Sequence, residues 1–66
     1  MSVVKVIEIT ASSPTSFAEA VKEGITKASE SIRGIKGAWV AEEYVVVENN
    51  TVKEFRVTMR VSFELE

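Results

Sequence analysis

Residues 52–65 read VKEFRVTMRVSFEL, and the alternation of apolar and polar residues in this stretch decides the fold. Every second residue from Phe55 to Leu65 is apolar, whereas the residues between them are charged or carry a hydroxyl group. A period of two is typical of a β-strand with one buried and one exposed face. The stretch is therefore predicted to form a long strand that packs one face against another layer.

The layer that covers this strand is predicted from a helical period earlier in the chain. Five apolar residues recur at steps of three and four, as they do on one helix face: Phe17, Val21, Ile25, Ala28 and Ile32. Ser16 followed by Glu19 forms a capping box at the start, with Ser13 before Pro14 as the competing start. Gly34 is the expected stop. Gly24 lies inside the helix, where the close approach of a backbone or a ligand would explain it.

Two further strands complete the predicted fold. Residues 3–10, VVKVIEIT, are rich in β-branched residues and are predicted to form the first strand. Residues 35–48 form a second long strand, which Asn49-Asn50 connects to the last strand as a two-residue turn. The expected fold is α+β, in the order β-α-β-β, with a three-stranded antiparallel sheet packed on one helix. We expect one domain over residues 1–66 and place the last strand at the centre of the sheet.

The Asn49-Asn50 turn also predicts which residues face each other in the hairpin. On the side away from the helix it places Trp39 opposite Arg60 and Glu43 opposite Arg56, as a cation–π pair and an ion pair. The first pair puts the only tryptophan of the chain outside the core. The uncovered sheet face is therefore expected to meet a partner chain, a planar ligand, or both.

On the helix side, the same register predicts one favourable and one unfavourable pair. Tyr44 lies opposite Phe55 and is expected in the core. Glu42 lies opposite Val57 among apolar side chains, where a carboxylate is poorly accommodated. A β-bulge in this long strand would remove the conflict and reverse the local facing.

Composition excludes several classes of function. The chain has no Cys and no His, so disulfides, thiolate nucleophiles and imidazole bases are absent. The eight Lys and Arg residues form no basic run, which argues against nucleic-acid binding. No apolar stretch approaches the length of a membrane span. We expect a cytoplasmic protein that is not an enzyme and has no membrane partner.

The length of 66 residues favours an assembly over an isolated chain. A chain of about 60 residues buries only about 60% of its unfolded surface and often needs an additional source of stability. Disulfides and Cys/His metal sites are excluded here, which leaves an unusually good core or oligomerisation.

The order of several segments resembles the dodecin family. MSVVKVIEI, SSPTSFAEAV, a helix ending near Ser31-Ile32-Arg33, and FRVTMRVSFELE follow one another at matching spacing over the whole chain. The resemblance implies a hollow homo-dodecamer with cubic symmetry. It further implies storage of flavin, such as riboflavin or FMN, stacked between Trp side chains at chain interfaces. Calcium dodecins are the alternative, since they lack the flavin apparatus and bind a cation.

Three positions depart from the pattern of the flavin-binding members. Gly37 stands at the usual Trp position, and Trp39 stands at the usual Glu position two residues later. Arg56 replaces the Gln that hydrogen-bonds the flavin ring, and Arg can donate but not accept. Other features, such as the first residues of the chain, are closer to calcium dodecins.

The candidate ligand-binding residues are Trp39, Arg56, Gly37, Arg60 and Glu43. For each there is a structural alternative: Trp39 at a chain–chain contact, Arg56 in the ion pair with Glu43, and Gly37 at a bulge. Glu42 and Glu48 are the candidate calcium ligands, because hard cations prefer oxygen. Their alternative is a solvated face.

Overall fold

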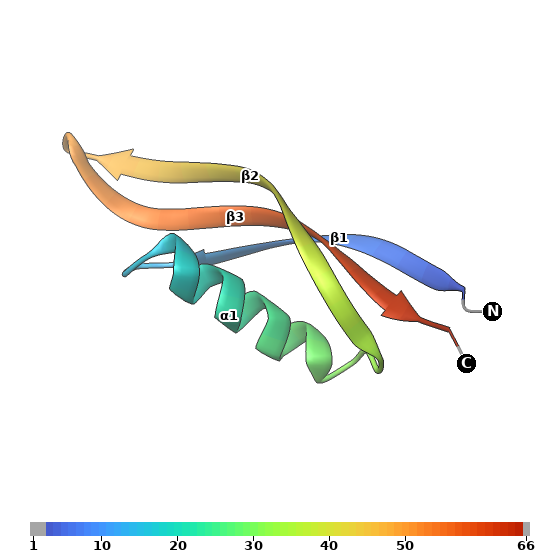
Figure 1. Ribbon diagram of the computed structural model, residues 1–66. Helices are drawn as coiled ribbons and strands as arrows, with labels where there is room; N and C mark the ends of the chain where they lie inside the picture. Colours follow the sequence, from blue (N-terminus) through green and yellow to red (C-terminus); the bar gives the residue numbers. More distant parts are fainter. Residues whose placement is uncertain (1–2, 66) are drawn as a thin grey trace.

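The computed structural model describes residues 3–65 and has the predicted element order (Figure 1). The elements are β1 (Val4–Ser13), α1 (Phe17–Ser29), β2 (Ile35–Glu48) and β3 (Thr51–Glu64). The strands form one antiparallel sheet in the order β1-β3-β2. The α+β fold class and the central place of the last strand are thus confirmed.

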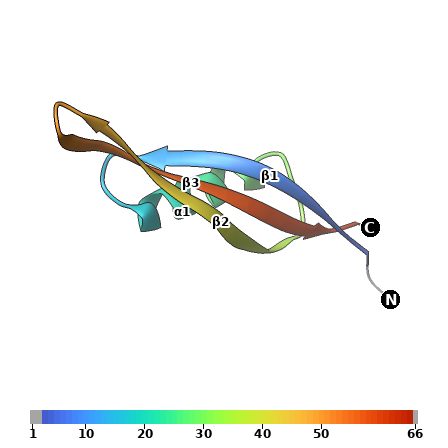
Figure 2. The same ribbon diagram turned by 90° about the horizontal axis from the view of Figure 1, so that it is seen from above.

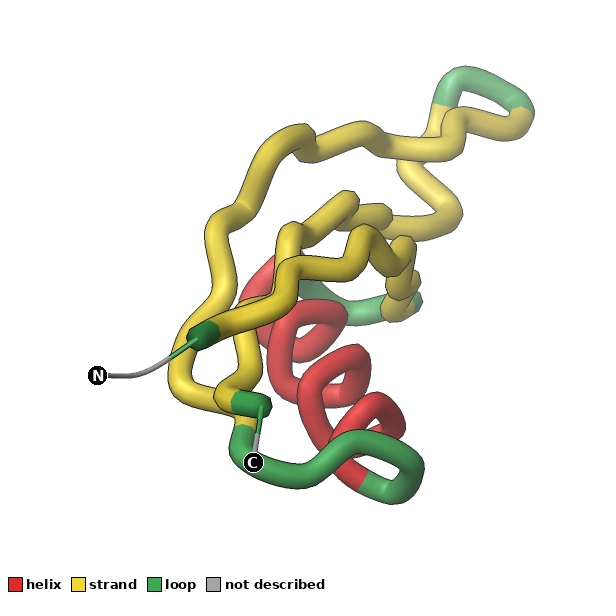
Figure 3. The backbone as a smooth tube through the Cα atoms, turned by 90° about the vertical axis from the view of Figure 1, so that its right-hand side faces the viewer, coloured by secondary structure: helices red, strands yellow, loops and turns green. Residues whose placement is uncertain are grey.

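The helix lies on one face of the sheet, and the other face is open (Figure 3). α1 packs against β1 and β3. The fully buried apolar side chains are Ala20 of α1 and Val57, Met59 and Val61 of β3. The alternation of β3 thus places these three residues in the core, while the residues between them point to the open side.

The two ends of α1 are determined by different local hydrogen bonds. Ser16 is the N-cap, and its Oγ accepts a hydrogen bond of 3.0 Å from the backbone N–H of Glu19, as predicted. The helix ends at Ser29, about one turn before the predicted end near Ser31-Ile32-Arg33. The Oγ of Ser29 donates to the carbonyl of Thr26 at 2.6 Å, a local bond that competes with helix continuation. Gly34 has a φ of 76° and provides the turn into β2 rather than the helix cap.

β1 is longer than its sequence pattern indicates. It continues from Thr10 to Ser13, because Ala11, Ser12 and Ser13 pair with β3. Ser13 is buried, and its Oγ accepts a hydrogen bond of 3.1 Å from the backbone N–H of Thr15. This small turn explains why Ser13 does not start the helix.

The hairpin turn has the predicted conformation. Asn49 and Asn50 have φ values of 54° and 59°. Two successive positive values define the type I′ turn, whose twist matches that of a two-stranded antiparallel ribbon. Asn tolerates this region better than most residues, so the turn forms at the expected place.

Two irregularities, one between Val46 and Val47 and a β-bulge at Ala41, change the pairing that the turn predicts for residues 42–46. Pairing from Gly37 to Val40 is as predicted, and it shifts by one residue between Val40 and Glu42. Tyr44 therefore lies opposite Arg56, and the prediction that it belongs to the core is wrong: it is 63% exposed. The bulge also moves Glu42 away from Val57 to a position opposite Thr58, as the unfavourable Glu42 pairing suggested.

The described part of the chain is elongated for its length. Its principal extents are 51 × 19 × 14 Å and its radius of gyration is 13.5 Å, against about 11 Å for a typical domain of this length. Its accessible surface is 4932 Å², whereas about 4,200 Å² is typical for this mass. Figures 1 and 2 show the cause, since the β2–β3 hairpin extends well beyond α1. The fold therefore leaves more surface open than one small core can bury.

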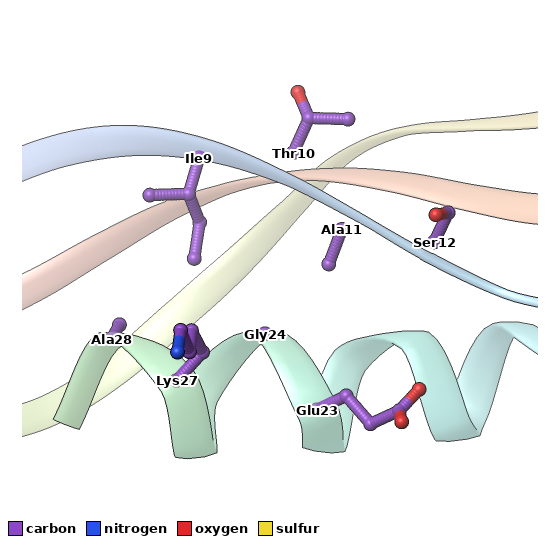
Figure 4. Close-up of a pocket in the computed structure, with 8 residues that line it drawn as sticks. All are labelled: Ile9, Thr10, Ala11, Ser12, Glu23, Gly24, Lys27 and Ala28. Atoms are coloured by element: carbon purple, nitrogen blue, oxygen red, sulfur yellow. The ribbon is translucent and has the colours of Figure 1, made fainter. Parts of the chain in front are cut away.

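Helix and sheet come into close contact at Gly24. A Cβ on Gly24 would lie 2.7 Å from Cε of Met59 and 2.9 Å from Cβ of Ala11. Figure 4 shows Ala11 pointing from β1 toward this position on α1. The close approach at Gly24 is thus made by side chains of the protein, and not by the backbone or ligand that the sequence suggested.

We expect Gly24→Ala to destabilise the protein. Alanine gains about 1 kcal/mol of helix propensity, but overpacking at these distances costs about 1–3 kcal/mol. Urea denaturation should show a net loss of about 1 kcal/mol. The double variant with Ala11→Gly should recover most of it, and a more stable single variant would contradict this packing.

Candidate functional site

The side of the sheet away from α1, here called the outer face, carries most of the predicted ligand-binding residues. Four rows of side chains cross it from β1 through β3 to β2: Val6–Ser62–Gly37, Glu8–Arg60–Trp39, Thr10–Thr58–Glu42 and Ser12–Arg56–Tyr44. Successive side chains on one face of a strand are about 7 Å apart, so the four rows span about 20 Å. This area is large enough to hold a planar heterocycle.

The Trp39 row places an aromatic ring beside a charged pair. Trp39 is 60% exposed, although it is the largest apolar side chain of the protein. Its neighbour Arg60 lies with Nε 3.6 Å from Oε2 of Glu8, on the other side of the central strand. Arg60 is thus occupied by a carboxylate on β1, while one strand further the indole of Trp39 is open to a second molecule.

The Tyr44 row also places an aromatic side chain beside an arginine, but Ser12 takes the place of a glutamate on β1 and the arginine pairs with a carboxylate on its own strand. Tyr44 is exposed, and Arg56 beside it donates from Nε to Oε1 of Glu54 at 3.0 Å. The predicted ion pair of Arg56 with Glu43 is wrong. The bulge at Ala41 places Glu43 opposite Val57, and so on the helix side of the sheet.

Between these two aromatic residues the outer face is hollowed. An open depression of about 410 Å³ is lined by Thr10, Glu42, Glu43, Tyr44, Arg56 and Thr58. The hydroxyl oxygens of Thr10 and Thr58 lie 3.3 Å apart across two strands. Guanidinium and hydroxyl groups donate hydrogen bonds here, whereas carboxylate and hydroxyl groups accept them. The depression is therefore suited to a polar group that both donates and accepts.

Gly37 lies at the end of the outer face, next to an irregularity in the pairing. The register shifts between Ile35 and Gly37, as the bulge interpretation of this glycine proposed. A Cβ on Gly37 would meet only Oγ of Ser62, at 3.9 Å. Ser62 donates from this Oγ to the Gly37 carbonyl at 3.2 Å. A side chain at position 37 would therefore have room. Because glycine has no side chain, Trp39 is not covered by residue 37.

The two candidate calcium ligands do not meet within one chain. Glu42 lines the depression, whereas Glu48 lies six residues further along β2, about 20 Å away. The Oε2 of Glu48 lies 3.1 Å from Nζ of Lys53. In the described residues, 3–65, no group of three acidic side chains is close enough to hold a metal ion. Any calcium site built from these residues would need several chains.

The structure thus brings together four of the five predicted ligand-binding residues on the outer face: Gly37, Trp39, Arg56 and Arg60. Glu43 contributes to the rim of the depression from the other side. The sequence interpretation missed Tyr44, Thr10 and Thr58. The unfavourable pairing of Glu42 was the signal, because a bulge at that point turns Tyr44 outward.

In the part of the chain that the structure describes, no helix is long and apolar enough to cross a membrane.

The arrangement of elements matches those of solved proteins over nearly the whole chain. The dodecin from Streptomyces davaonensis superposes with a TM-score of 0.95 at 26% identity, over 98% of this chain and 96% of that chain. The calcium dodecin of Mycobacterium tuberculosis, whose crystal structure is described as having a novel calcium-binding site, superposes with a TM-score of 0.85 at 34% identity. The superposition covers 97% of this chain and 91% of that chain.

Sequence comparison leads to the same group. The Mycobacterium tuberculosis calcium dodecin is 37% identical over 65 residues, which are 98% of this chain and 92% of that protein. The Dodecin family model matches residues 3–66. With the β-α-β-β topology and the open outer face, these matches establish that the chain belongs to the Dodecin family.

Proposed function

We propose that this protein is a non-catalytic binding and storage protein that sequesters a flavin, riboflavin or FMN, at the chain interfaces of a homo-dodecamer. The observation that carries the proposal is the exposed Trp39 beside Arg60 on an uncovered sheet face. Residues 1–66 act in it as one dodecin-like domain.

The exposed apolar surface supports the proposed homo-dodecamer. Large apolar side chains are at least 45% exposed at both ends of the sheet, and they include Val4, Val6, Val47 and Val52. Soluble monomers seldom expose contiguous apolar surface of this kind, which usually marks an interaction site. β1 and β2 also have open edges, which natural proteins commonly cover or pair. Contacts with further copies of the same chain would bury these side chains and strand edges.

The chemistry of the outer face supports a planar ligand. Trp39 and Tyr44 offer aromatic faces, and Arg56 and Arg60 lie next to them. Stacking of a base on an aromatic side chain contributes about 1–3 kcal/mol in nucleic-acid complexes, and an isoalloxazine ring is a larger π-system of the same kind. A chain without Cys or His has few groups for acid–base or nucleophilic catalysis, so binding is the function that these residues can perform.

Titration of the ligand-free protein with riboflavin tests this proposal. Flavin emission and Trp39 emission should be quenched together at micromolar concentrations, because stacking brings the two rings into contact. Trp39 is the only tryptophan, so its emission needs no correction for a second indole. Unchanged emission from both groups up to high micromolar riboflavin would reject a flavin site.

The second candidate is a cation-binding or purely structural shell. It is favoured by the identity of 37% to a calcium dodecin, and by the Gly37 and Arg56 departures from the flavin-binding pattern. Glu42 and Glu48 would then act as calcium ligands gathered from several chains. Calcium calorimetry separates the candidates: heat of binding without any riboflavin quenching supports the shell, and riboflavin quenching without a calcium effect rejects it.

A further inference from the structure

We propose that residues 42–46 of β2 exchange between the pairing of the structure and a second pairing shifted by one residue. The exchange moves Tyr44 from the outer face to the helix side of the sheet and puts Glu43 in its place. This inference goes beyond the proposed function, because it concerns the pairing of β2 with β3 and holds whichever ligand the outer face binds.

The two irregularities that bound residues 42–46 compensate each other. The extra residue of β2 is Ala41, and the extra residue of β3 is Lys53. The pairs on either side, such as Val40 with Met59 and Val47 with Val52, belong to the single register that the hairpin turn sets. Bringing both extra residues into the ladder would therefore restore continuous pairing without moving any pair outside the segment.

The second register gives the segment comparable partners. It places Tyr44 opposite Phe55, whose ring already meets that of Phe17 edge-on at 5.2 Å. It also places Glu43 opposite Arg56 on the outer face. Cross-strand aromatic pairs and opposite charges both stabilise a sheet, and no bulge then interrupts the ladder.

The carboxylate on the helix side does not decide between the two registers. Glu43 faces Val57 in the structure, and Glu42 would face it after the slide. The fully buried apolar side chains include none from β2, and the hairpin extends past α1 (Figure 1). The segment can therefore slide without repacking the core.

Tyr44 has no anchor on the outer face within the described chain. Its side chain is 63% exposed, and no hydrogen bond of residues 3–65 involves its hydroxyl group. The neighbouring Arg56 donates to Glu54 instead. The contacts of Tyr44 thus do not hold the segment in one register.

The register determines the chemistry of the outer face. With Tyr44 outward, the depression has an aromatic wall beside Arg56. With Glu43 in its place, the same wall is a carboxylate. A molecule that contacts Tyr44 on the outer face can do so in one register only, so its binding shifts the segment towards that register. The slide is therefore a switch built into the hairpin.

Disulfide trapping in the intact oligomer tests the exchange, because the chain has no cysteine of its own. Glu42→Cys with Thr58→Cys, the first pair, places two thiols opposite each other only in the register of the structure. Glu43→Cys with Arg56→Cys, the second pair, does so only after the slide, since these residues now lie on opposite faces. We expect both pairs to oxidise, the second at about 0.1–10% of the rate of the first, which is the usual population of a minor state.

Ala38→Cys with Ser62→Cys is the matched control. It has the same offset of one residue but lies outside the segment, so it should stay reduced. Deleting Ala41 and Lys53 together leaves a regular ladder with Tyr44 outward, and this deletion should abolish the second disulfide and keep the first.

Three results would overturn the inference. The second pair could stay reduced, which would show that the segment does not slide. The control could oxidise as fast as the second pair, which would show general opening of the hairpin. The second disulfide could also persist in the deletion variant, where the slide no longer relieves any irregularity.

Discussion

Replacing Trp39 with alanine is expected to weaken riboflavin binding about 10- to 100-fold. The indole is 60% exposed and lies on the outer face, so its removal deletes a stacking surface without opening a cavity in the core. Loss of about 1–3 kcal/mol of stacking corresponds to this range of affinity. Fluorescence quenching of riboflavin measures the effect directly.

Trp39→Phe is the matched control for this prediction. Phenylalanine keeps an aromatic face of smaller area, so it should lose less affinity than alanine. Light scattering on both variants separates a ligand role from a role at a chain–chain contact. An alanine variant that binds riboflavin like the wild type would show that Trp39 does not stack on the ligand. A variant that dissociates into single chains would show that the indole holds chains together.

Replacing Met59 with alanine should have the largest effect on stability. Met59 is fully buried at the centre of β3, and its Cε fills the space beside Gly24. Truncation of a buried Met costs about 2–5 kcal/mol, which is a large share of the stability of a domain of this length. We expect a fall in melting temperature of at least ~8 °C, or no folded protein at all.

Met59→Leu provides the comparison, because it keeps most of the volume and should cost less than about 1.5 kcal/mol. Both variants should be melted at the same protein concentration, since the stability of an oligomer depends on concentration. Equal melting temperatures for Met59→Ala and the wild type would contradict the central place of this side chain in the core.

The elements of the fold could be predicted because local patterns determine them. The alternation of residues 52–65, the Ser16 cap and the Asn49-Asn50 turn each depend on residues adjacent in sequence, and each formed where expected. The end of α1 was missed by one turn. The position of the helix end depends on a competing hydrogen bond of Ser29 and on where β2 begins. The helical period of apolar residues predicts neither of these.

The candidate site was predicted less completely, because it depends on two irregularities in the pairing of β2 with β3. Two one-residue shifts of the pairing, between Val40 and Glu42 and between Val46 and Val47, together exchange the faces of the residues from Glu42 to Val46. Trp39 and Gly37 precede both shifts and kept their predicted places, whereas Glu43 and Tyr44 lie between the shifts and changed sides. The conflict at Glu42 showed that a bulge was favourable, but the alternating pattern alone does not locate its position.

Size-exclusion chromatography of the riboflavin-saturated protein, with light scattering and visible absorbance recorded together, tests the central claim most directly. We predict one peak with twelve times the chain mass of 7.3 kDa, carrying the absorbance of riboflavin. A peak at the mass of one chain would contradict the account, as would a twelve-chain peak that elutes without riboflavin.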